Sequence, residues 1–171
     1  MEILILGVLL VALMVYVSTR IKKSAAQAFE AETIDAGEFT IVKPEGFLNP
    51  IDDKSAFAFE AYSKDFGKGE NMENVRQAQA FVSVSKAGNL AEAGARAKKE
   101  AGEILSEESG GQICTIKSRE TLENASAYNF YKIAASEKNK NIYELKITVL
   151  EDFLDDYQNR VDEMLESFRL K

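Results

Sequence analysis

The chain has 171 residues, a formal net charge of −7, a single cysteine and no histidine. The acidic balance argues against nucleic acid as a partner, because the phosphate backbone repels a negative surface. The lack of histidine removes the commonest general base and metal ligand, and one cysteine cannot form an internal disulfide. Catalysis by carboxylates alone stays open, but no spacing of acids singles out a pair, so the sequence favours a protein that is not an enzyme.

The first stretch of the chain, residues 3–21, is apolar and carries no charge up to Val17. As a helix it rises about 28 Å, close to the thickness of a bilayer core. We therefore expect one transmembrane helix in an anchor of residues 1–23, with the lipid bilayer as a partner. The residues that mark this span are Ile3, Leu10, Val17 and Ile21.

Three cations, Arg20, Lys22 and Lys23, follow the apolar stretch. Because positively charged flanks stay on the cytoplasmic side, they predict a single-pass protein whose domain lies on that side of the membrane. A cleaved signal peptide would carry positive charge before the apolar run, where Glu2 is the one charged side chain. Export of the domain behind an uncleaved anchor is the alternative.

After a stalk of residues 24–32, residues 33–171 are long enough for one globular domain. Period-two alternation predicts its strands and is clearest over 143–149, where apolar and polar residues alternate throughout. The predicted strands cover residues 33–42, 55–62, 77–85, 112–122, 127–135 and 143–149.

Two stretches change to helical period. Asn89 is a good N-cap with Glu92 three residues later, and apolar residues recur at helical spacing as far as Leu105, before Gly110. The stripe of this helix is mostly alanine, which predicts close packing on the sheet. A last helix is predicted over residues 151–169, with acids in its first turns and cations at its end.

The resulting order is β-β-β-α-β-β-β-α, and its short connections suit antiparallel pairing. We therefore expect an α+β fold in which a six-stranded antiparallel sheet packs with two helices as an α/β/α sandwich, preceded by one transmembrane helix.

Short sequence motifs accompany this order of strands and helices. Residues 39–47 read Phe-Thr-Ile-Val-Lys-Pro-Glu-Gly-Phe, a strand that runs into a Pro-x-Gly-aromatic turn, and the last helix ends in Leu-Glu-Ser-Phe at residues 165–168. With the closing strand at Tyr143, they resemble the PsbP/Mog superfamily over about residues 33–170. The resemblance implies an α/β/α sandwich without catalytic residues, in a family whose members mostly bind, scaffold or chaperone other proteins.

Together these features predict a membrane-anchored, non-catalytic protein-binding domain, an accessory or assembly subunit of a membrane-associated complex. The alternative is a chaperone or adaptor that binds an apolar segment of a client protein and exposes an apolar sheet face that no helix covers. An enzyme that uses carboxylates is the third hypothesis. No catalytic, cofactor-binding or metal-binding residue is predicted.

Three apolar residues in predicted loops, Phe47, Leu48 and Phe66, are candidates for contact with a partner, because loops are exposed and carry function. They could equally fold back onto the core as lids. The acids over 151–156 lack the spacing of a calcium loop and suit a helix N-terminus instead. Cys114, on a predicted strand, is expected to be a small buried hydrophobe.

Overall fold

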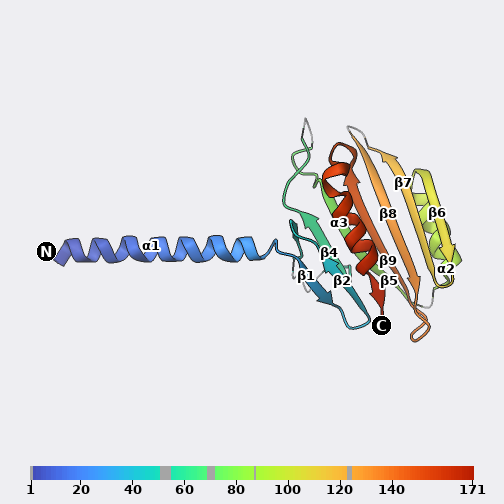
Figure 1. Cartoon of the computed structure of the whole chain (residues 1–171), viewed down its shortest axis with the longest axis horizontal. Coiled ribbons are helices and arrows are strands. Elements are labelled where there is room, and N and C mark those ends of the chain that lie inside the picture. Colours follow the sequence, from blue (N-terminus) through green and yellow to red (C-terminus); the bar gives the residue numbers. More distant parts are fainter. Residues whose placement is uncertain (1, 51–54, 69–71, 87, 123–124) are drawn as a thin grey trace.

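The computed structural model describes residues 2–50, 55–68, 72–86, 88–122 and 125–171, and of residues 2–9 and 25 only the backbone. Helix α1 (Glu2–Gln27) extends away from a globular part that holds the other elements (Figure 1). Two hydrogen bonds join the chain after this helix to the globular part. Lys43 Nζ donates to the Ala28 carbonyl at 2.8 Å, and the Gly46 N–H donates to the Phe29 carbonyl at 2.7 Å.

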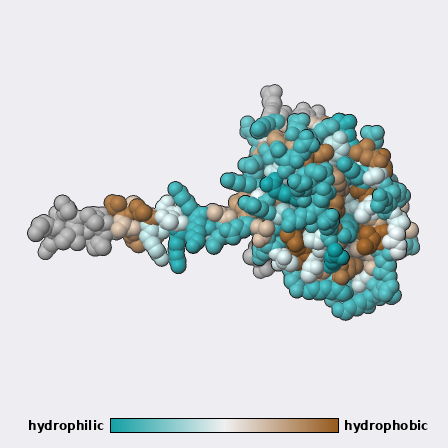
Figure 2. Space-filling model, viewed as in Figure 1, coloured by the Kyte–Doolittle hydropathy of each residue, from teal (hydrophilic) through white to brown (hydrophobic). Residues whose placement is uncertain are grey.

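The predicted transmembrane helix is wrong for the part of the chain that the structure describes, where no helix is long and apolar enough to cross a membrane. Among the side chains of α1 that the structure describes, those from Leu10 to Val17 are uncharged, and polar residues follow after Val17. Figure 2 shows hydrophobic surface on this part of α1 giving way to hydrophilic surface toward the globular part. The predicted single-pass location on the cytoplasmic side is overturned by the same finding.

The large sheet has seven antiparallel strands among the described residues, in the spatial order β3-β4-β5-β9-β8-β7-β6. The four long strands β5, β9, β8 and β7 form its centre, and β6 forms an edge at which every residue is exposed. The strands are β3 (Phe47–Leu48), β4 (Phe59–Ser63), β5 (Ala78–Ser85), β6 (Glu103–Gly110), β7 (Ile113–Thr121), β8 (Ser126–Ala135) and β9 (Ile142–Leu150).

A small sheet joins the two ends of the domain. Its order is β1-β2-β10, so that the C-terminal strand pairs with a strand from the start of the domain. Gly37 forms the turn between β1 and β2 with φ 82°, and its N–H donates to Asp35 Oδ1 at 2.9 Å. The strands are β1 (Glu32–Asp35), β2 (Phe39–Lys43) and β10 (Arg169–Leu170).

Two helices cover opposite faces of the large sheet (Figure 1). Along β8, Phe130 and Ala134 join the hydrophobic cluster under α3, whereas Tyr131 and Ile133 join the cluster under α2. Since alternate residues of a strand point to opposite faces, the helices define an α3 side and an α2 side. The helices are α2 (Leu90–Glu100) and α3 (Leu154–Ser167), the latter preceded by a 3-10 turn (Glu151–Phe153).

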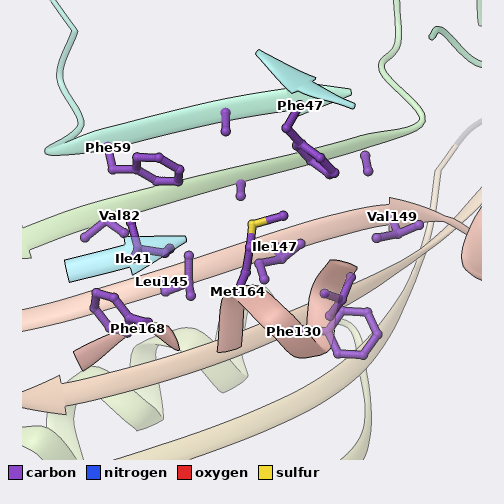
Figure 3. Close-up of a cluster of buried hydrophobic side chains, with 14 of the residues drawn as sticks. Ile41, Phe47, Phe59, Val82, Phe130, Leu145, Ile147, Val149, Met164 and Phe168 are labelled. Carbon is purple, nitrogen blue, oxygen red and sulfur yellow. The ribbon is translucent and has the colours of Figure 1, made fainter. Parts of the chain in front are cut away.

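The α3 side holds the larger core. Met164 of α3 and Phe168 just after it point toward Leu145 and Ile147 of β9 (Figure 3), and Ile41 of β2 closes the cluster from the small sheet. All of these side chains are buried. Burying one large aliphatic or aromatic side chain contributes about 1.5–3 kcal/mol, so this cluster is the main source of hydrophobic stabilisation.

The predicted fold class is therefore corrected: over the described residues there are three helices and two sheets, of three and seven strands, in place of one six-stranded sheet and two helices behind a transmembrane span. The stretch 33–42 contains two strands, because Gly37 turns the chain within it. The helix predicted as far as Leu105 ends at Glu100, because Gly102 adopts φ 63° and Glu103–Gly110 then form β6. The structure also contains two short strands that the sequence did not predict, β3 and β10.

Candidate functional site

Helix α2 covers only half of its side of the sheet. Its buried alanines pack on β7 and β8, together with the start of β9. On β4 and β5 the side chains that point to the α2 side are half-buried and lie outside the cluster under the helix. The register places Phe81 between Glu60 and Lys146, and Gln79 between Tyr62 and Thr148. We call these six residues the open face.

Aromatic side chains stand on and beside the open face. The ring of Phe57, which precedes β4 and is 41% exposed, lies 4.6 Å from the ring of Phe81 between centroids. Tyr62 is the diagonal cross-strand neighbour of Phe81 on the same face, a separation within reach of aromatic side chains. Aromatic side chains therefore recur along the outer strands, with polar residues of the open face between them.

Arg76 extends this aromatic surface. Its guanidinium carbon lies 3.8 Å from the ring centroid of Phe66 and 4.7 Å from that of Tyr62. Its Nη1 donates to the carbonyls of Ser63 at 3.1 Å and Lys64 at 2.8 Å. The guanidinium is thus held in place by two carbonyls and two rings. We call Phe57, Tyr62, Phe66, Arg76 and Phe81 the aromatic patch.

The three residues predicted to contact a partner lie in different environments. Phe47 is fully buried and meets Tyr157 edge-on at 5.8 Å between ring centroids, Leu48 is half-buried, and Phe66 is 40% exposed. The structure therefore brings Phe66 to the surface and leaves Phe47 inaccessible to a partner. Their joint role in binding stays a prediction.

The residues predicted to mark the span and its topology lie along α1. Leu10, Val17 and Ile21 are exposed on the helix, and Ile3 falls outside the side chains that the structure describes. The cations Arg20, Lys22 and Lys23 are exposed too, and Arg20 lies over the ring of Tyr16 at 5.7 Å.

The acids before α3 take part in local pairing. The Arg119 guanidinium donates to Glu151 Oε2 at 2.6 Å, and this hydrogen bond lowers the pKa of the Glu151 carboxyl. Within the described part of the chain, no three side chains of the kinds that ligate metals gather into a possible ion site. Cys114 is buried under α2, as its strand position predicts, and burial raises the pKa of its thiol.

Of the aromatic patch, the sequence predicts only Phe66 as a contact residue. The pattern of β5 nevertheless indicates a second member. The alternation of β5 places Phe81 opposite the apolar face of Ala80 and Val82, so its exposure to the other side could be inferred from the sequence. Arg76 carries no such signal, because its partners are rings and carbonyls from the other side of a loop.

Neither a protein-family model nor a curated protein sequence matches the chain. Solved structures do resemble it. The Ran-binding protein Mog1p of Saccharomyces cerevisiae has a TM-score of 0.55 at 12% identity, covering 83% of this chain and 96% of that one. Cyanobacterial PsbP from Synechocystis has a TM-score of 0.54 at 12% identity, covering 83% and 92%. LpqN of Mycobacterium tuberculosis, involved in cell envelope biogenesis, has a TM-score of 0.58 at 9% identity, covering 83% and 91%.

These likenesses confirm the PsbP/Mog-like fold that the turn at residues 39–47 and the order of the later elements indicated. At identities this low they show the fold alone.

Proposed function

We propose that this chain is a non-catalytic protein-binding domain, an accessory or adaptor subunit that binds a partner protein through the aromatic patch. The observation that carries the proposal is the half of the α2 side that no helix among the described residues covers, with Arg76 fixed over two aromatic rings at its margin. A protein of this fold, Mog1p, is by its name a Ran-binding protein, which supports binding as a use of the fold.

The composition of the patch suits a protein interface. Aromatic residues and arginine are enriched in interface cores and dominate binding energies, particularly where polar residues surround them. Here Glu60, Gln79 and Thr148 of the open face supply the polar surroundings. Because two carbonyls already hold the Arg76 guanidinium, little side-chain entropy is lost when a partner covers it.

The same composition weighs against the chaperone alternative. A groove for an apolar segment of a client needs a continuous apolar floor, whereas the aromatic side chains of the open face alternate with Glu60, Gln79 and Lys146. A folded partner with a polar surface matches this mixture better, because its own donors and acceptors can pair with these groups.

The test is affinity capture on the full-length chain with quantitative mass spectrometry. We compare the wild type with Phe57→Ser/Phe66→Ser, which removes two exposed rings, and with Leu105→Ser, a matched loss of an exposed apolar residue on the edge strand β6. We expect a stoichiometric partner whose recovery falls about tenfold or more in the patch variant. The Leu105→Ser variant should retain this partner at the wild-type level.

Equal recovery by all three proteins would contradict the proposal, and so would equal loss in both variants. Far-UV circular dichroism and thermal melting should show that both variants stay folded, because each replaced side chain lies at the surface and outside the buried core.

A further inference from the structure

A concave surface lies on the α3 side, on the opposite face of the sheet from the aromatic patch. It is a cleft of about 330 Å³ between the end of α3 and β10 on one wall and β7 and β8 on the other. This volume is at the lower end of the ~300–1,000 Å³ range of small-molecule sites. The residues of this cationic cleft that matter here are Ile113, Lys132, Ala134, Phe168, Arg169 and Leu170.

The walls of the cleft are mainly aliphatic. Ile113 from β7 is 42% exposed even though its cross-strand partner, Ala134, is buried. Leu170 on the opposite wall is only partly buried and packs against the α3-side core, to which Phe168 belongs. An exposed isoleucine that faces a half-buried leucine leaves apolar surface in contact with water, which a bound alkyl chain would cover.

Two cations stand in this apolar setting. Lys132 is half-buried, and within the part of the chain that the structure describes its ammonium donates one hydrogen bond, to the carbonyl of Leu165 at the end of α3. A lysine ammonium has three donors, so two are left for a ligand. In the described ranges neither Lys132 nor Arg169 forms a salt bridge.

The electrostatics of Lys132 point the same way. Burial lowers the pKa of its ammonium, the nearby charge of Arg169 lowers it further, and Glu166 has a smaller opposite effect. The strongest charged influence on this desolvated cation is therefore a like charge. An anion placed between the two cations would relieve both the desolvation and the repulsion.

We propose that the cationic cleft binds a free carboxylate with a short alkyl chain, such as a medium-chain fatty acid. The chain would pack on Ile113, Ala134 and Leu170, and the carboxylate would accept hydrogen bonds from Lys132 and Arg169. A small anion without an alkyl chain would leave the aliphatic walls wet, and a neutral lipid would leave the cations unpaired. The two features together select an amphiphilic carboxylate.

The test is isothermal titration calorimetry of the full-length protein with sodium decanoate, and with decanol as the uncharged probe. The variants are Lys132→Met, which keeps the aliphatic stem, Arg169→Gln, and the two combined. The control is Lys117→Met, which removes a cation from the α3 side of β7, outside the cleft, where its ammonium lies over the rings of Tyr128 and Phe130.

We expect decanoate to bind the wild type and the Lys117 variant alike, and the double variant about tenfold or more weakly. Decanol should bind weakly and equally to all. The proposal is overturned by no decanoate binding up to about 1 mM, by equal binding of decanol and decanoate, or by unchanged binding in the double variant. If Lys132→Met unfolds the domain, the test rests on the exposed Arg169→Gln variant alone. Wild-type affinity for decanoate in that variant would contradict the proposed pairing of Arg169 with the carboxylate.

Discussion

The two sides of the large sheet are closed in different ways. On the α3 side, large side chains from α3, the sheet and the small sheet interlock in one cluster that includes Met164 and Phe168. On the α2 side, a helix whose buried residues are Ala93, Gly94 and Ala97 packs on two central strands. Small side chains let that helix lie close, but they cannot reach across to β4 and β5.

The two helices cover different parts of the sheet: α2 packs on β7 and β8, whereas α3 packs on β8 and β9 and on β2 of the small sheet. The α2 side is open over β4 and β5, where the aromatic patch lies, and the α3 side is open beside β7, where the cationic cleft lies. Opposite the cationic cleft, the α2 side of β7 and β8 carries α2. The stability of the fold and its binding surfaces can thus be tested separately.

The largest effect is expected on the α3 side. Met164→Ala removes a fully buried side chain from the interlocked cluster and should lower the free energy of unfolding by about 2–5 kcal/mol. Urea denaturation followed by circular dichroism measures the loss. Met14→Ala makes the same change at an exposed position of α1 and should stay within about 0.5 kcal/mol of the wild type. Equal effects of the two changes would show that the α3 side is not the main core.

The α2 side should instead be sensitive to added volume. Ala97→Leu places a larger side chain where α2 packs on β7 and β8, and we expect a loss of about 1–3 kcal/mol from overpacking. Ala95→Leu on the exposed side of the same helix is the control and should be nearly neutral. A neutral Ala97→Leu in the same denaturation assay would mean that the helix is not held close to the sheet.

The sequence predicted those parts of the fold that depend on neighbouring residues. The alternation over 143–149 lies within β9, and Asn89 caps α2 as expected, its side chain accepting a hydrogen bond from the Ala91 N–H at 2.9 Å. The end of α2 escaped the pattern because Ile104 and Leu105 continue the helical spacing by chance. The helix ends because of Gly102, which adopts a positive φ. A Cβ at this position would lie 2.7 Å from the Arg119 carbonyl oxygen, a contact with another strand.

The candidate surfaces were less predictable for the same reason. Phe66 could be proposed from its place in a polar loop, but Phe47 looked equivalent in the sequence and is buried against Tyr157 of α3. Which of the two is exposed depends on how β3 and α3 meet, and that contact spans more than a hundred residues of chain. Lys132 and Arg169 likewise line one cleft only because the end of α3 and β10 lie beside β7 and β8.

The smallest change in the free energy of unfolding is expected for polar groups buried on the two sides of the sheet. Two buried tyrosines, one from each side, differ in their hydrogen bonding: on the α3 side the Tyr157 hydroxyl donates to Gln77 Oε1 at 3.1 Å, whereas the Tyr131 hydroxyl on the α2 side has no partner among the described residues. Tyr157→Phe leaves the Gln77 oxygen unpaired and should cost about 0.5–1.5 kcal/mol. Tyr131→Phe removes a buried hydroxyl that forms no hydrogen bond within the described part of the fold, so the free energy of unfolding at pH 7 should be unchanged or slightly raised.

Alkaline pH sharpens the contrast. Burial first, and then the charges of Glu144, Glu120 and Glu100, raise the pKa of Tyr131 from 10.0 to about 12. Between these values the unfolded chain releases the phenol proton while the folded protein keeps it, so the stability of the wild type falls as pH rises. Tyr131→Phe lacks this proton and should lose less stability over that interval in urea denaturation. Parallel pH profiles for the wild type and Tyr131→Phe would show that the hydroxyl reaches water, and that the α2 side is more open around Tyr131 than its packing indicates.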